Sequence, residues 1–194
     1  ETGCAVRSNA GAVTLLSDDG VERLSLPGPA LALAATTSGW LVATDEALLA
    51  VDADGGTESQ VLPPGARVTA VSPIDDAVAI GRSDGTVTIL RDGGASVALQ
   101  HASLSAVVRI VAGPRATVFS GHADGTLVLH EVEHGDRLDT RAMHGAVSFL
   151  QRTDEGLHDG TDLGDTMLWR TSELTRDYCA LLRTLWSEIP SVWD

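Results

Sequence analysis

Short apolar runs alternate with turn residues along most of the chain, and this pattern predicts strands rather than helices. One stretch shows it clearly. Residues 117–120 form a β-branched and aromatic run, Asp124-Gly125 follows, and residues 126–132 then alternate between two sides. Asp-Gly is typical of a two-residue hairpin turn, because glycine tolerates the positive φ that the turn requires. The stretch therefore indicates antiparallel strands joined by tight turns.

The same sequence of strand, turn and strand recurs at a nearly constant interval. The residues that follow the turns are Ala12, Ala47, Thr86, Thr126 and Asp165, which lie 35, 39, 40 and 39 residues apart. A period of about 40 residues made of strands and turns is typical of a β-propeller blade. The sequence therefore predicts an all-β chain built from repeated sheets.

Each interval accommodates up to four short strands. The second, third and fourth repeats contain four each, expected at residues 30–36, 40–44, 47–51 and 58–62, then 67–72, 77–82, 86–91 and 96–100, then 106–112, 117–120, 126–132 and 137–141. The first and last repeats offer three each, expected at residues 5–8, 12–16 and 21–26, and at 146–151, near Leu157 and at 166–170. Because five blades need two more strands, either upstream sequence completes the ring or the first strand of the last repeat joins the three strands of the first repeat in a seam blade.

The end of the chain has a different pattern. Residues 172–188 carry apolar side chains at helical spacing, Ser172 is a suitable N-cap, and Pro190 would end the helix. We therefore divide the chain into a repeat domain at residues 4–171 and a C-terminal helix with a Trp-containing tail at residues 172–194.

The repeats resemble a divergent bacterial WD40-type β-propeller repeat protein. The stretches that carry this resemblance are residues 83–90, 121–130 and 164–169. Trp169 matches the family's tryptophan, but Arg170 replaces the aspartate that follows it, and Leu90 and His130 occupy the tryptophan position elsewhere. His101 and His144 lie where the family often has a histidine. The family's Asp-His-Ser/Thr-Trp hydrogen-bond network is therefore incomplete in every blade.

The resemblance implies a β-propeller of about five four-stranded blades, closed or as an incomplete or fragment ring, with the C-terminal helix outside it. It also implies a non-catalytic protein-interaction or sensor scaffold, one module of a larger bacterial multidomain signalling protein. The expected partner is another protein or another domain of the same chain. The oligomeric state stays open.

Composition narrows the classes of partner. The net charge is −14, and all 13 basic residues are arginine. Nucleic acid is not an expected partner, because binding to phosphate backbones needs clustered positive charge. No apolar run is long enough to span a membrane.

Arginine without lysine, beside abundant alanine and glycine, indicates a GC-rich bacterial genome. Only two cysteines occur, which favours a reducing, cytoplasmic location. The chain begins without methionine, so we expect the natural protein to extend upstream.

One motif suggests catalysis. Residues 130–134, His-Glu-Val-Glu-His, match the zinc-peptidase pattern H-E-x-x-H, which places two histidines one helical turn apart. On the strand expected here, His130 and His134 would lie about 13 Å apart, too far to bind one ion. No nucleophile elbow or phosphate-binding loop occurs. We therefore expect no enzyme activity, no metal and no cofactor. A zinc peptidase remains one alternative, and a propeller enzyme or small-ligand sensor that uses the central channel remains another.

Partners of propellers usually bind at the loops of one face or in the channel. On that basis the candidate partner-binding residues are Arg67, His101, Arg109, His122 and His144. Arg109 stands out because it interrupts an apolar inner strand, where a charge is least expected.

Overall fold

The computed structural model describes residues 4–17, 20–52, 56–91, 95–171 and 183, and these contain 18 strands in five antiparallel sheets. In every sheet, consecutive strands are hydrogen-bonded neighbours. The first sheet comprises β1 (Cys4–Arg7), β2 (Val13–Ser17) and β3 (Gly20–Arg23). The second comprises β4 (Ala32–Ala35), β5 (Gly39–Ala43), β6 (Ala47–Asp52) and β7 (Thr57–Val61). The third comprises β8 (Val68–Ile74), β9 (Ala77–Arg82), β10 (Val87–Arg91) and β11 (Ser96–Ala98). The fourth comprises β12 (Val107–Ala112), β13 (Thr117–His122), β14 (Thr126–Glu131) and β15 (Arg137–Ala142). The fifth comprises β16 (Val147–Thr153), β17 (Gly156–Thr161) and β18 (Thr166–Trp169).

This arrangement confirms the predicted all-β class and the strand number expected for each repeat. The strand expected near Leu157 is β17. The predicted C-terminal helix and tail fall on residues 172–194, nearly all of which lie outside the described residues. Within the part of the chain that the structure describes, no helix is long and apolar enough to cross a bilayer.

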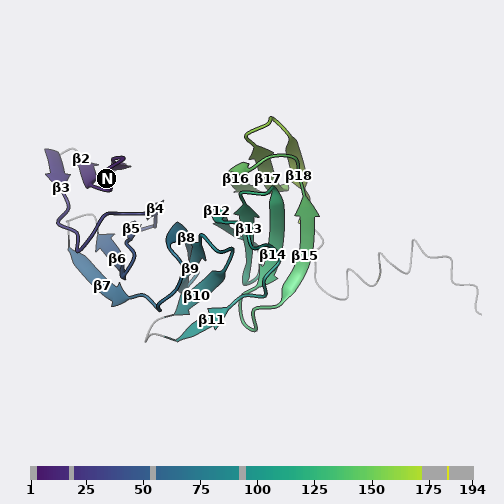
Figure 1. Cartoon of the computed structure of the whole chain (residues 1–194), viewed down its shortest axis with the longest axis horizontal. Helices are drawn as coiled ribbons and strands as arrows, with labels where there is room; N and C mark the ends of the chain where they lie inside the picture. Colours follow the sequence, from purple (N-terminus) through teal and green to yellow (C-terminus); the bar gives the residue numbers. More distant parts are fainter. Residues whose placement is uncertain (1–3, 18–19, 53–55, 92–94, 172–182, 184–194) are drawn as a thin grey trace, which may run out of the picture.

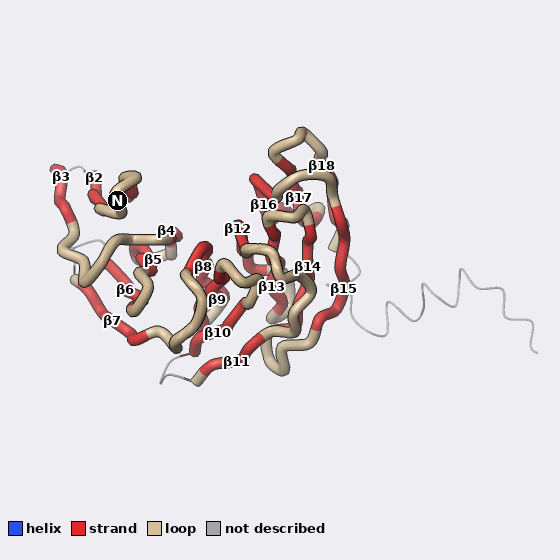
Figure 2. Tube along the Cα trace, in the orientation of Figure 1, coloured by secondary structure: helices blue, strands red, loops and turns tan. Residues whose placement is uncertain are grey.

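The five sheets follow one another along an arc (Figures 1 and 2). The first strand of each full sheet lies beside the first strand of the next, so that β4, β8, β12 and β16 line the concave side. No hydrogen-bonded ladder joins β1–β3 to β16–β18 among the described residues. The described residues therefore form propeller-like blades without a closed ring and without the seam blade that the sequence allowed.

Apolar side chains fill the junction between each pair of successive sheets, in four separate clusters. The alternation of a strand explains this, because successive side chains point to opposite faces. In β9, Ile80 packs in the cluster shared with the second sheet, whereas a Cβ on Gly81 would meet the Val107 side chain of the fourth sheet. A sheet buried on both faces needs apolar residues at successive positions, which accounts for the nearly continuous apolar runs.

Aspartate-glycine turns connect the central strands of the third and fourth sheets. Gly85 and Gly125 have φ values of 85° and 86°, in the left-handed region that glycine adopts without strain. The carboxylates of Asp84 and Asp124 accept the backbone N–H groups of Thr86 and Thr126 at 3.1 and 3.0 Å. These turns join the second and third strands of the third and fourth sheets at the same edge.

Candidate partner-binding site

The turns and inter-sheet connections at one edge of the sheets form a surface that we call the loop face. It comprises the connections at residues 24–31, 62–67, 99–106 and 143–146 and the turns at residues 8–12, 44–47, 83–86, 123–126 and 162–165. Backbone hydrogen bonds hold turns and connections together. The N–H of Ser83 donates to the carbonyl of Arg67 at 2.9 Å, and the N–H of Ala123 donates to that of Ala106 at 2.9 Å. The loop face is therefore built on the rigid edges of the sheets.

Negative charge dominates the loop face. Its acidic residues are Asp45, Glu46, Asp84, Asp124, Asp162 and Asp165, against the single arginine Arg67. The Thr86 hydroxyl donates to Asp84 at 2.7 Å and lowers the pKa of that carboxyl. Burial opposes ionisation of Asp124, but hydrogen bonds from Ser103 and Thr126 outweigh it and lower the pKa. Both carboxylates are therefore charged at neutral pH.

Two large apolar side chains project from the same surface. Leu104 is 84% exposed in the connection between β11 and β12, and Leu163 is 73% exposed in the turn between β17 and β18. Neither leucine is needed to fill a junction between sheets. Exposed aliphatic side chains within a charged rim are typical of surfaces that bind another protein.

Three of the five predicted residues lie on the loop face with exposed side chains: Arg67, His101 and His144. The His144 side chain is 95% exposed, and its Nδ1 lies 3.2 Å from a carboxylate oxygen of Asp165. Asp165 also accepts the backbone N–H of His144 at 3.1 Å, so the pair fixes the connection between the fourth and fifth sheets.

His122 differs from the prediction, because it is only 1% exposed and does not reach the surface. It is the last residue of β13 and points between the third and fourth sheets. Its Nδ1 donates to the carbonyl of Ser105 at 3.0 Å, and its Nε2 lies 3.2 Å from the hydroxyl of Ser120. We correct the prediction: His122 is buried beneath the loop face and binds the carbonyl of Ser105 in one of its connections.

His130 completes a chain of buried hydrogen bonds, with its Nε2 3.4 Å from the same Ser120 hydroxyl. Since a carbonyl can only accept, His122 carries its proton on Nδ1, and its Nε2 accepts from Ser120. Ser120 then accepts from the Nε2–H of His130, whose Nδ1 is buried without a partner. Burial lowers the pKa of His122, and burial followed by the charges of His122 and Arg137 lowers the pKa of His130 to about 4. All three groups are therefore neutral at physiological pH.

This geometry does not fit the zinc-peptidase alternative. His130 is buried on β14, while the His134 side chain is 72% exposed in the turn after the strand. The carboxylate of Glu131 accepts the backbone N–H groups of Glu133 and His134, at 2.5 and 2.7 Å. Ligand atoms of Glu131, Glu133 and His134 lie within 4.8 Å of one another, but these contacts form the turn itself. The two motif histidines therefore do not share a face.

Asp159 is a buried charge that the sequence analysis missed. It is 3% exposed on β17, and neither carboxylate oxygen has a fully formed hydrogen bond. Burial raises its pKa to about 6, against smaller lowering effects of the Met167 N–H and Arg141. Arg141 instead lies over the Trp169 ring, 4.2 Å from its centroid. The sequence carried a signal for this burial. A glycine recurs in β9, β13 and β17, and the residue before it is Ile80, Ser120 and Asp159 in turn, so Asp159 occupies the position of the buried Ile80.

The concave side contains a cavity of about 610 Å³ lined by β4, β8 and β12. Arg109 reaches its edge and donates from Nε to the carbonyl of Ser148 at 3.0 Å, which ties β12 to β16. Arg7, which the sequence did not single out, donates to the carbonyls of Ala30 and Leu31 at 3.2 and 3.0 Å. Both guanidinium groups therefore join neighbouring sheets.

Comparisons with known proteins bear on the fold. No family model matches the chain, and no curated protein matches its sequence. The computationally designed Ika4 protein has a TM-score of 0.64 and 25% identity, covering 75% of this chain and 93% of its own. The computationally designed Ika8 protein has a TM-score of 0.72 and 24% identity, covering 88% of this chain and 56% of its own. A chain of the Mitotic Checkpoint Complex has a TM-score of 0.63 and 19% identity, covering 72% of this chain and 46% of its own. These likenesses support an all-β chain of propeller-like blades.

Proposed function

We propose that the protein is a non-catalytic interaction scaffold whose loop face binds a basic segment of another protein, or of another domain of its own chain. The observation that carries the proposal is the composition of the loop face: it holds six acidic residues and one arginine, and the exposed Leu104 and Leu163 lie on the same face. Electrostatic complementarity would draw a basic segment to this face, and the two leucines would add apolar contact. We extend the proposal to one module of a larger bacterial cytoplasmic signalling protein.

Buried polar groups support a structural rather than a catalytic role. Ser120, His122 and His130 form a hydrogen-bonded row, but each is at most 2% exposed, so a substrate cannot reach them. The histidines that do reach the loop face, His101 and His144, have no nucleophile placed against them in the described contacts. The arginines at the concave cavity hold backbone carbonyls, so no contact there favours a ligand sensor.

Peptide binding by the whole chain tests the proposal. A panel of fluorescein-labelled peptides would combine leucine or serine with arginine or glutamate, and fluorescence anisotropy would report binding. We expect peptides of leucine and arginine to bind, and the affinity to fall with added salt. The double variant Leu104→Ser/Leu163→Ser should bind at least about tenfold more weakly, because it removes both apolar contacts.

The matched control is Phe149→Ser, which removes an exposed apolar side chain outside the loop face. It should bind as the wild type does. Equal binding of arginine and glutamate peptides, or equal affinity of the double variant and the wild type, would overturn the proposal.

A further inference from the structure

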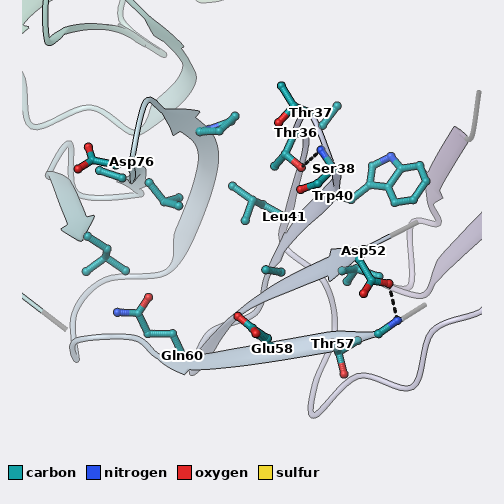
Figure 3. Close-up of a pocket in the computed structure, with 18 of the residues that line it drawn as sticks. Thr36, Thr37, Ser38, Trp40, Leu41, Asp52, Thr57, Glu58, Gln60 and Asp76 are labelled. Carbon is teal, nitrogen blue, oxygen red and sulfur yellow. Dashed lines mark hydrogen bonds between the residues drawn. The ribbon is translucent and has the colours of Figure 1, made fainter. Parts of the chain in front are cut away.

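A second concave surface lies between the second and third sheets, away from the loop face. It is a cleft of about 1030 Å³, lined by the β4–β5 turn, β6 and β7 on one side and by the β8–β9 turn on the other. Figure 3 shows Leu41 in its centre, Glu58 and Gln60 along β7, and Asp76 facing them from the third sheet. The volume is at the upper end of the range for ligand pockets, and it accommodates several residues of an extended peptide.

The cleft exists because one position in the second sheet holds a small side chain. Ala50 of β6 pairs with Leu41, in the register where the third and fourth sheets have Ile89 and Leu129. Those two residues are 0% and 2% exposed and fill their junctions, whereas Ala50 is exposed. The junction between the second and third sheets is therefore left open at its outer half.

The neighbouring strand adds a charge at the same place. Glu58 of β7 pairs with Ala50, at the position where Val97 pairs with Ile89 in the third sheet. A carboxylate thus replaces an aliphatic side chain that packs between the third and fourth sheets. The floor of the cleft remains apolar, with Leu41 and Leu90 only 5% and 2% exposed.

The charges around the cleft define its occupant. Four carboxylates line it, those of Asp52, Glu58, Asp75 and Asp76, and its lining includes no arginine, lysine or histidine among the described residues. Arginine and lysine pack their aliphatic stems on apolar surface while the charged group stays at a polar rim. The exposed Ala50 and the half-buried Val78 offer that surface above the buried Leu41 and Leu90, and the carboxylates offer that rim.

We propose that this cleft binds an extended, basic peptide segment of a partner protein. An aliphatic side chain of the peptide lies over Leu41 and Ala50, and an arginine or lysine beside it contacts Glu58 and Asp76. The cleft is a second surface with different residues, so this inference shares with the proposed function the expectation of a basic protein segment but does not depend on the loop face.

The test uses the whole chain in the Leu104→Ser/Leu163→Ser background, which separates the cleft from the loop face. The probe is a fluorescein-labelled octapeptide of alternating leucine and arginine, followed by fluorescence anisotropy. Adding Ala50→Leu should weaken binding by about tenfold, because the leucine occupies the place of the peptide's aliphatic side chain. Ala142→Leu, on the exposed strand β15, is the matched control and should leave the affinity unchanged.

A second variant keeps the proposal testable if Ala50→Leu unfolds. Glu58→Gln/Asp76→Asn leaves the cleft open and should weaken binding by about tenfold at low salt, with a smaller effect at high salt. Glu22→Gln, on the exposed strand β3, is its control.

The inference is overturned if the octapeptide does not bind, if both cleft variants bind it as the background does, or if a leucine–glutamate octapeptide binds equally well. Concentration-dependent dimerisation that Ala50→Leu abolishes would also overturn it, since the occupant would then be a second copy of the chain. None of these results decides the role of the loop face, which depends on Leu104 and Leu163.

Discussion

Replacing Asp159 with asparagine should change how the stability of the protein depends on pH. Asp159 lies between the fourth and fifth sheets, 3% exposed and without a fully formed hydrogen bond. Burial penalises its charged form and raises its pKa from the ordinary value of 3.8 to about 6. The native protein therefore holds a proton on Asp159 at pH values where the unfolded chain has already released it.

The size of the effect follows from these two pKa values. Below pH 3.8 the carboxyl is protonated in both states, and its neutral form is tolerated in the junction. As the pH rises from 3.8 to about 6, the unfolded chain releases this proton while the native state keeps it, so the native state loses stability until it too is charged. The total loss is about 3 kcal/mol, since each pKa unit corresponds to about 1.4 kcal/mol. About 1.4 kcal/mol of this loss falls between pH 5 and pH 8.

Urea denaturation at several pH values between 5 and 8 measures this loss while staying above the sequence pI of about 4.6. The difference in unfolding free energy between wild type and Asp159→Asn should shift by about 1.4 kcal/mol in favour of the variant as the pH rises. Taking the difference between wild type and variant removes the contributions of the other titrating groups. Following how that difference changes with pH also removes the cost of burying the asparagine amide, which does not depend on pH. Asp154→Asn removes an exposed carboxylate from the nearby β16–β17 turn and should show almost no shift. A difference that does not change with pH would refute the argument that Asp159 is buried and neutral at low pH.

Two further substitutions test the buried hydrogen bonds beneath the loop face and one of its turns. Ser120→Ala should lower the unfolding free energy by about 1–3 kcal/mol, because it leaves two buried imidazole groups without their shared hydroxyl. Ser83→Ala, in an exposed turn, should change it by less than about 0.5 kcal/mol in the same urea titration. Gly125→Ala should cost about 1–3 kcal/mol, because the residue has a φ of 86° and its new Cβ would meet the carbonyls of Met143 and Gly145. Gly28→Ala, where a Cβ meets nothing within 4 Å, is the control in thermal unfolding. Equal stability of either variant and its control would contradict the packing described here.

The candidate site shows where the sequence stopped being informative. The repeat identified the turns and connections that form the loop face, and it placed Arg67, His101 and His144 there. It assigned His122 to the same surface because the residue is near a turn in sequence. Burial depends on the neighbouring sheet, and the third sheet covers that side of β13. The cleft at Ala50 was missed for the same reason, since an alanine in a strand becomes a gap only when the facing sheet leaves space beside it.

Local pattern by itself determined the strands, the Asp-Gly turns and the interval between repeats, because alternation and turn conformation depend on residues close together in the chain. Tertiary structure decided the rest: that the arc stays open among the described residues, that Ser120 joins two histidines, and that Asp159 is buried without a fully formed hydrogen bond. The open arc and the burial of Asp159 depend on packing between sheets, whereas the Ser120 row depends on the pairing of β13 with β14, which brings His130 to a serine ten positions away.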